Sequence, residues 1–586
     1  MRKKASLLIV AILSAVCAGA QSTYLQIGSD NYLLLDRMET LSGRLCDSLR
    51  VNSKGESRKS AVNYVEHVSK AIADSIDSSR YSSIDRYNMR QLISESGEWA
   101  GDEHGEIKSK HSWFNALYKN QYNMVYIKKK DFFVVLNPIL NAVTTIDKNT
   151  PEFKGGTSRR LYNAHDGEIR GWIGKKIGFY TMFTDVQEQL PGFVYNYAVK
   201  DTPYQRMAVP GADYFLLPAT RGGAFNYLQA SGYIDFAALK DKVNITFGSG
   251  KHFVGDGITS LFLSDFSSNM PFLRLRTRIW KLNYETQYVE LTSQYKKGAD
   301  KVYPHKFATM HNISMNVTRW MNLGFFEAVV FDRPNAYEIG YLNPVVFTVS
   351  LNSFNGSGDK ALLGFYGKMI IAKRVQLYGQ AMLNEFRAKE FFSASGWYGN
   401  KWGLQGGAKY FDALGIANLD LQAEVNAVRP YTYSAKDTLA NYTNYNQPLA
   451  NPLGSGFVQA IGVARYQPVR NLAFTLKWMY YIQGVDTGRA NLGNNIFNPY
   501  TSAAKTYGVK LINGPRSECN SINLNISWQV RRNLFIDAGS AYRKYENTAK
   551  VYPDYSSTGV VNGPLTTTYY YLGLRINAQR RDYSFF

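Results

Sequence analysis

Hydrophobic and polar side chains alternate with a period of two along most of the chain after about residue 131. The alternation is cleanest at 522–530, where apolar residues occupy every second position and Asn, Ser or Gln lies between them. It recurs at 419–426, 472–480 and 572–576. Because successive side chains of a strand point to opposite faces, each segment predicts a strand with one apolar and one polar face.

The links between these strands alternate in length. Short links at 412–417, 467–471 and 530–533 are interleaved with long links, which lie at 386–400, 429–454, 484–519 and 547–566. Short periplasmic turns and long external loops are typical of an up-and-down barrel in an outer membrane, whereas the strands of a sandwich are shorter and joined by more uniform turns. The pattern predicts an all-β, antiparallel transmembrane barrel of sixteen to nineteen strands around a wet lumen, and an even number is favoured for such barrels.

Near the N-terminus, the hydrophobic positions do not alternate with a period of two. From about residue 30 to residue 100, Leu34, Met38, Leu41 and Leu45 recur every three or four positions, and two further helical segments follow at 62–76 and 83–99. This spacing predicts three short helices that pack together. We therefore expect a small helical periplasmic domain at 21–120 and the barrel at 121–586, with the helices acting either as a cap or as a docking surface for a periplasmic protein partner.

The first twenty residues have the composition of a secretory signal. Three cations (Arg2, Lys3 and Lys4) precede an apolar run at 7–16 and the small residues 18–20. The run is too short to span a membrane, which favours a cleavable signal peptide at 1–20 over an anchor. Lipidation at Cys17 is the less favoured alternative, because Val16 is a poor residue before a lipidated cysteine. With the barrel, this places the protein in the outer membrane of a Gram-negative bacterium.

The net charge of the chain indicates which partners to expect. The 586 residues include 67 Lys and Arg against 46 Asp and Glu, a formal net charge of +21. For an exported protein this favours anionic surroundings such as lipopolysaccharide and outer-membrane lipid, or acidic glycans, and no motif points to nucleic acid. Cys46 and Cys519, the cysteines outside the signal, lie in different predicted regions, so no disulfide is expected.

The sequence offers little for catalysis. It has seven histidines and lacks the GxSxG, HExxH and phosphate-loop patterns, and its Cys and His spacing does not fit a zinc site. We expect a protein that is not an enzyme, with no catalytic residues, no cofactor and no metal.

An arginine ladder is the strongest charged constellation. Arg274, Arg276 and Arg278 share one face of a predicted strand whose other face is apolar. If the apolar face meets lipid, the guanidinium groups point into the lumen, where they can bind carboxylate or phosphate. The alternative, which we favour, is that Glu285 or Glu290 of the next strand neutralises them.

A single acid interrupts an apolar face further along. Glu327 stands on the same parity as Leu323 and Phe325. Because a carboxylate that faces lipid is costly, we expect a bulge that turns Glu327 inward into a salt bridge, or a position at the membrane interface.

The long loop at 429–454 is rich in tyrosine. Aromatic faces suit sugar rings and cations suit uronic acids, so the candidate glycan-binding residues are Arg429, Tyr431, Tyr433, Lys436, Tyr442 and Tyr445. The alternative is that these residues pack on one another.

Several segments resemble a known family. Residues 248–264 with 271–275, then 311–331, 341–344 and 359–364, resemble in order the motifs of the Wzi-like capsule-assembly family of outer-membrane proteins, whose Bacteroidota branch is often described as gliding-motility associated. The resemblance implies an 18-stranded barrel with an N-terminal helical part that binds and organises surface polysaccharide in capsule assembly or attachment. The alternative is a channel or scaffold of a gliding-motility or secretion assembly.

Two further expectations concern topology. If the turns at 318–321, 373–374 and 412–417 are all periplasmic, residues 331–360 form one external excursion, with 341–359 at or in the outer mouth. The ending RDYSFF, an aromatic residue after an amphipathic strand, resembles the recognition signal of barrel-assembly substrates.

Overall fold

The structure is a computed structural model of the chain. It describes residues 22–74, 79–101, 122–148, 159–174, 176–199, 209–212, 214–219, 224–238, 242–293, 302–333, 336–345, 358–487, 490–548 and 564–585. The signal peptide predicted at 1–20 lies outside these residues.

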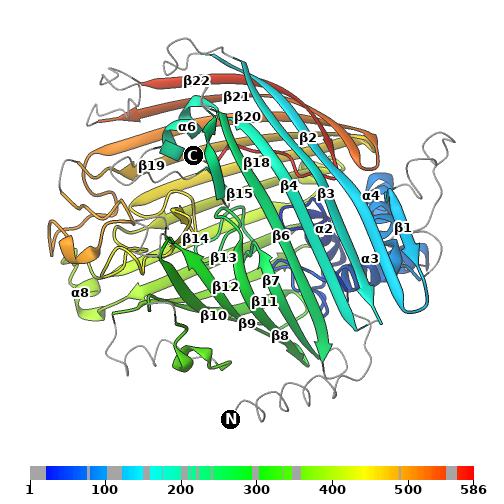
Figure 1. The fold of residues 1–586 in the computed structure, drawn as a ribbon, viewed down its shortest axis with the longest axis horizontal. Helices are drawn as coiled ribbons and strands as arrows, with labels where there is room; N and C mark the ends of the chain where they lie inside the picture. The colour runs from blue at the N-terminus through cyan, green and yellow to red at the C-terminus, as the bar shows by residue number, and fades with distance from the viewer. Residues whose placement is uncertain are drawn as a thin grey trace.

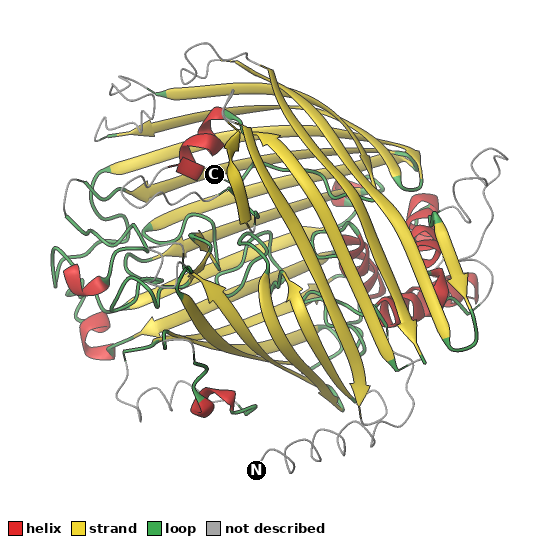
Figure 2. Cartoon of the chain, in the orientation of Figure 1, coloured by secondary structure: helices red, strands yellow, loops and turns green. Residues whose placement is uncertain are grey.

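Eighteen antiparallel strands form a closed barrel (Figures 1 and 2). In chain order they are β2 (Phe132–Lys148), β3 (Arg159–Ile173), β4 (Ile177–Gln189), β6 (Ala224–Ala238), β7 (Val243–Gly250), β8 (Met270–Ile279), β9 (Leu282–Thr292), β10 (His305–Asn316), β11 (Met321–Phe331), β12 (Lys360–Ile371), β13 (Val375–Glu385), β14 (Lys401–Tyr410), β15 (Leu419–Val428), β18 (Phe457–Val469), β19 (Leu472–Gly484), β20 (Arg516–Arg531), β21 (Leu534–Asn547) and β22 (Leu565–Ile576). Each strand pairs with the next, and β22 pairs with β2 to close the wall. The predicted fold class and strand number are confirmed.

Shorter elements complete the fold. β1 (Val125–Lys128) and β5 (Tyr214–Ala219) extend the edges of β2 and β6, and β16 (Thr443–Asn444) pairs with β17 (Gln447–Pro448) inside a loop. The helices are α2 (Asn31–Ser42), α3 (Arg58–Asp74), α4 (Ser83–Glu95), α6 (Gly192–Val199) and α8 (Ala388–Phe392), and the 3₁₀ turns are η2 (Gly97–Trp99), η5 (Ile339–Leu342), η6 (Ala413–Gly415) and η7 (Tyr500–Ser502). Among the residues that the structure describes, no helix is long and apolar enough to cross a membrane.

The faces of the wall follow the predicted alternation. On β20, Ile522, Leu524 and Trp528 are exposed on the outside, whereas Asn523 and Asn525 are buried on the lumen side. An apolar belt outside and a polar interior are the features of an outer-membrane barrel, and the protein is one.

The two ends of the barrel differ. The links at 174–176, 280–281, 372–374, 411–418, 470–471 and 532–533 lie at one end and are short, and the long loops lie at the other. By the usual orientation of such barrels, the short-turn end faces the periplasm. Helices α2, α3 and α4 lie at this end (Figure 1). The backbone N–H of Leu45, just after α2, donates to the carbonyl of Arg319 in the turn between β10 and β11, at 2.7 Å.

The chain end lies inside the barrel (Figure 1). β22 ends at Ile576, and the following residues turn into the lumen, where Arg581 pairs with Glu188 of β4 at 2.9 Å. Tyr583 is buried in an apolar cluster with Val186 and Tyr227. The described part of the RDYSFF ending, residues 581–585, therefore fills part of the lumen and does not continue the last strand.

Candidate functional site

The arginine ladder holds the N-terminal segment. Arg276 of β8 pairs with Glu285 of β9, the neighbour expected to neutralise it, and also donates to the backbone carbonyls of Gly55 and Lys54. Both charged side chains are buried. Arg278 is exposed near the short-turn end, where its guanidinium approaches the carbonyl of Asp47 at 3.4 Å. Arg274 and Arg276 are thus buried on the lumen side of the wall whereas Arg278 is exposed, and Arg276 binds the segment between α2 and α3.

A second arginine joins the helices to the wall. Arg37 of α2 reaches three carboxylates: Asp85 of α4 at 2.7 Å, Asp412 in the short turn at 2.7 Å, and Asp420 of β15 at 2.6 Å. Burial disfavours the charged form of Arg37, but these carboxylates outweigh that effect and raise the pKa of its guanidinium above the ordinary value. The helical segment is thus bound to the barrel interior through charge.

Two acids of α2 extend this network. Asp36 accepts from Lys409 of β14 at 2.6 Å, and Lys368 of β12 lies 3.4 Å from Glu39 and 3.2 Å from Asp256. Burial opposes the ionisation of Asp36, yet the two ammonium groups hold the pKa of its carboxyl below the ordinary value.

The glycine-rich segment after β7 folds into the lumen. Glu424 of β15 accepts from the backbone N–H groups of Ile258 (2.6 Å) and Thr259 (3.1 Å). Phe262 is fully buried, and its ring stacks on Phe326 of β11 at 5.1 Å. It also lies against Gly364 of β12, where an added Cβ would come within 2.1 Å of the ring. Three segments that carry the family resemblance, 248–264, 311–331 and 359–364, therefore pack on one another inside the barrel.

Glu327 does not turn inward. The pairing of β11 with β10 and β12 runs through Glu327 without a bulge, so its side chain points to the outside of the wall. It is nevertheless 1% exposed, and its Oε1 lies 3.9 Å from Nε2 of the buried His311 on β10. The predicted bulge is wrong.

A strap formed by residues 336–345 covers this part of the outer face. Tyr341 packs on Val329 and Phe331 and accepts from the Thr309 hydroxyl through its carbonyl at 2.7 Å, and the Tyr288 hydroxyl donates to the carbonyl of Leu342 at 2.9 Å. The Tyr341 hydroxyl donates to Asp359 at 2.8 Å.

Because these wall side chains have outward parity, the strap lies on the outside of the barrel, below the wall in Figure 1. β11 pairs directly with β12, so the predicted single excursion between residues 331 and 360 is confirmed. The described part of this excursion lies on the outer wall and not at the outer mouth, which corrects the predicted position.

Most of the candidate tyrosines are structural. Tyr431, Tyr433 and Tyr442 are buried: the hydroxyl of Tyr431 donates to the carbonyl of Asn491 at 2.7 Å, that of Tyr433 donates to the carbonyl of Leu261 at 2.8 Å, and the rings of Tyr433 and Tyr442 stack 5.8 Å apart. Burial raises the pKa of Tyr431 to about 12. The loop therefore packs on itself, as the alternative held, and these three rings offer no face to a sugar.

The other three candidates keep some contact with solvent. Lys436 is exposed, while Arg429 and Tyr445 are half-buried. The guanidinium of Arg429 donates to the carbonyl of Val509 at 2.9 Å, and burial lowers its pKa. A glycan contact by these three residues stays a prediction.

The long loops form one outer surface. The segment 395–398 pairs with 506–509 through three backbone hydrogen bonds of 2.9–3.0 Å, and the Thr501 hydroxyl donates to the carbonyl of Lys436 at 3.1 Å. We call the exposed side chains that these contacts join the outer basic face; they are Arg387, Lys436, Lys505, Tyr507 and Lys510, with the half-buried Trp397. Tyr507 is 54% exposed, and Arg387 lies 4.4 Å above the ring of Trp397.

Sequence reasoning missed most of this face. The sequence predicts that the loops at 386–400 and 484–519 are long and external, but all of the predicted binding residues lie in the tyrosine-rich loop. The mixture of Arg387, Trp397, Lys505 and Tyr507 in the two neighbouring loops was the available signal.

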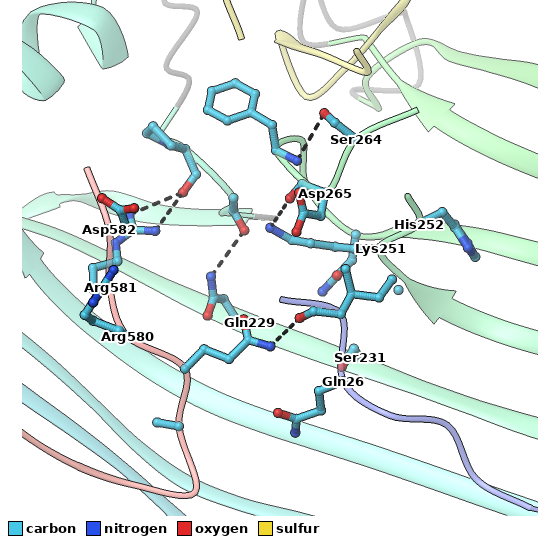
Figure 3. A pocket seen from close by; sticks show the side chains of 18 of the residues that line it. Gln26, Gln229, Ser231, Lys251, His252, Ser264, Asp265, Arg580, Arg581 and Asp582 are labelled. Atoms are coloured by element: carbon cyan, nitrogen blue, oxygen red, sulfur yellow. Dashed lines mark hydrogen bonds between the residues drawn. The ribbon is translucent and has the colours of Figure 1, made fainter. Parts of the chain in front are cut away.

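Two cavities lie within the lumen. One, of about 510 Å³, is lined by residues of both chain termini, the glycine-rich segment and the wall (Figure 3). The other, of about 600 Å³, lies nearer the helices and is lined by Arg37, Glu95, Arg170 and Asp420 among others. Lys477 and Arg580 line both. In the described part of the chain, no group of His, Cys, Asp and Glu side chains is arranged to hold a metal ion.

The chain resembles solved outer-membrane barrels. It is similar to Wzi, an outer-membrane protein involved in group 1 capsule assembly in Escherichia coli and a carbohydrate-binding β-barrel, with 12% identity over 96% of this chain and 100% of that chain and a TM-score of 0.53. It is also similar to OprD of Pseudomonas aeruginosa, with 9% identity over 75% of this chain and 94% of that chain and a TM-score of 0.39. No family model and no curated protein matches the chain. The likeness to Wzi supports a Wzi-like barrel fold.

Proposed function

We propose that the protein is a non-enzymatic barrel that binds and organises surface polysaccharide, in the manner of the Wzi-like capsule-assembly family and its Bacteroidota branch. The observation that carries the proposal is the outer basic face, which is a braced surface of cations and aromatic rings at the end of the barrel that faces away from the cell. The likeness to Wzi, described as carbohydrate-binding, supports it.

The chemistry of this face fits an acidic glycan. Lys436, Lys505 and Lys510 supply exposed ammonium groups, and the Arg387 guanidinium lies over the Trp397 ring. A polymer that touches several such groups at once gains affinity from many weak contacts, and rising salt screens them. Hydrogen bonds between the loops order the face before binding, which reduces the entropy lost on binding.

The test is binding of the detergent-solubilised protein to surface polysaccharide from its own host at low and high salt. A variant with Arg387, Lys436, Lys505 and Lys510 changed to alanine loses four contacts, each of roughly 0.2–1 kcal/mol, and we expect affinity to fall by about tenfold or more. The matched control changes Lys70, Arg90, Lys129 and Lys130, exposed cations of the short-turn end, and is expected to bind as the parent does.

Equal loss in both variants would show only non-specific attraction to a basic protein. Absence of binding by a folded barrel would remove the proposal. The remaining alternative, a channel or scaffold of a motility or secretion assembly, would then be tested by single-channel conductance and by capture of periplasmic proteins on α3 and α4.

A further inference from the structure

The cavity of about 510 Å³ carries an excess of positive charge. Five Lys and Arg side chains and two Asp side chains line it; they are Lys251, Arg274, Lys477, Arg580 and Arg581, with Asp265 and Asp582. Three of the cations have internal partners. Arg581 pairs with Glu188 at 2.9 Å, Lys477 lies 3.8 Å from Asp582, and the Lys251 ammonium donates to the backbone carbonyl of Asp265 at 3.1 Å.

Arg274 has a buried donor atom, Nε, without a hydrogen-bond partner among the described residues. Its side chain is only 3% exposed, and its guanidinium lies 4.8 Å from the ring of Tyr24 and 5.4 Å from that of Phe272. Its neighbour Arg276 donates to Glu285, and Asp235 and Glu285 attract the guanidinium of Arg274 electrostatically. A guanidinium beside aromatic rings can donate from its N–H groups to a bidentate acid.

Arg580 is a second cation of the cavity lining, and it lies beside Arg581 and Asp582 in Figure 3. It is half-buried, and among the described residues it has no hydrogen bond or ion pair, although Asp582 attracts it electrostatically. Asp537 and Asp30 attract it as well, so its charge is already stabilised electrostatically, and its N–H groups can donate to a further acid.

The remaining lining suits a sugar. Tyr24, Tyr233 and Tyr180 form a row in that order, with ring centroids 5.1 and 5.4 Å apart, and Gln26, Gln229 and Ser231 supply amide and hydroxyl groups. Gln229 lies in the centre of the view in Figure 3, between Arg580 and Gln26. Ligand sites have volumes of about 300–1,000 Å³, and this one has room for roughly one or two sugar rings.

We propose that this lumen cavity binds an anionic sugar, with Arg274 and Arg580 holding its acidic group and the tyrosine row lying along its ring. The site is distinct from the outer basic face and is formed jointly by residues before α2, by the wall and by the segment after β22. An occupant would bridge the two ends of the chain across the lumen.

The test uses the full-length protein in detergent and isothermal titration calorimetry with digalacturonate, with galactobiose as the uncharged counterpart and with inorganic phosphate. We expect digalacturonate to bind at one site per chain and galactobiose to bind at least tenfold more weakly. Arg274→Gln and Arg580→Gln, which each remove one charged hydrogen-bond donor group, should each weaken digalacturonate binding by about tenfold or more.

The matched control is Arg278→Gln, an arginine on the same face of β8 that does not line the cavity. It should leave the affinity within about twofold of the parent, since only local contacts at the cavity matter. The four-residue alanine variant of the outer basic face should also bind digalacturonate normally, which separates this site from the proposed outer one.

Several outcomes would overturn the proposal. These are no binding of digalacturonate to the folded protein, equal binding of galactobiose, binding of phosphate as tight as that of digalacturonate, or binding that survives both Arg274→Gln and Arg580→Gln. Thermal unfolding and far-UV circular dichroism of each variant verify that the barrel is intact.

Discussion

Different kinds of interaction close the two ends of the barrel. At the short-turn end, α2 is attached to the wall by buried charge, with Arg37, Asp36 and Glu39 reaching acids and lysines of β12, β14 and β15. At the long-loop end, the loops fold inward around one apolar cluster that includes Phe262, Tyr433 and Leu449. Charge pairs depend on pH and on every partner being present, whereas apolar packing depends on shape and volume.

The comparison teaches how each closure fails. A buried ion-pair network is destabilised strongly when one member is lost, because the others stay buried without partners. An apolar cluster loses stability in proportion to the space left empty. Each end should therefore respond to its own kind of substitution and leave the other end unchanged.

The largest effect is expected for Phe262→Ala. The change removes a fully buried ring that fills the space above Gly364 and stacks on Phe326, and should cost about 4 kcal/mol. Hydrogen exchange followed by mass spectrometry should show faster exchange at 251–269 and 429–456, with α2 to α4 still protected. The control is Phe365→Ala, which removes a ring that is 59% exposed on the outer face. Faster exchange in the helices as well would refute independent closure.

Arg37→Met is expected to have the next largest effect. It leaves the buried Asp85 and Asp420 and the half-buried Asp412 without their cation and should cost about 3 kcal/mol. Exchange should increase in α2 and α4 while the inward loops stay protected. The control is Arg90→Met, which changes an exposed arginine of α4 and should leave the exchange rates nearly unchanged. Unchanged protection of α2 in Arg37→Met would mean that charge does not hold the helices.

The smallest effect is the pH dependence of one carboxyl. Lys409 and Lys368 depress the folded-state pKa of Asp36 below its ordinary 3.8, so its contribution to stability is fully present above about pH 5 and is lost as the pH falls through the folded value. Asp36→Asn should destabilise α2 by about 1.5 kcal/mol at pH 7 and by less below pH 4.

Burial raises the pKa of Glu39, so its contribution to stability changes with pH in the opposite direction. Comparing the variant with the parent separates the effect of Asp36 from that of Glu39, because both proteins contain Glu39. The measurement is the difference in the free energy of opening of α2, from hydrogen exchange with intrinsic rates corrected for pH. A difference that stays constant from pH 7 to pH 3 would contradict the assigned pKa shift.

The wall was largely predictable from the sequence. The strict alternation at 419–426 and 522–530 fixes which side chains meet lipid, because a strand has only two faces. The same rule correctly turned Arg274 and Arg276 inward, and the parity of the short turns correctly joined β11 to β12 across a long excursion.

What covers each face was not predictable. Glu327 has the outward parity that the pattern gives it, but its burial depends on a strap that begins several residues later and returns along the outer wall. The sequence predicts Tyr431, Tyr433 and Tyr442 as binding residues, but the structure buries them. Their burial depends on partners such as Leu261 and Asn491, which lie far away in the sequence. Period and spacing report local geometry and contain no information on such contacts.

The position of α2 bears on the order in which the barrel assembles. Its wall partners Lys368, Lys409, Asp412 and Asp420 all lie in the middle of the chain, whereas the seam joins β2 to β22, the first and last strands of the wall. A nascent sheet that ends at β15 already contains every one of these partners. The helical segment can therefore dock on an open sheet, and the remaining strands then close around a scaffold that is already in place.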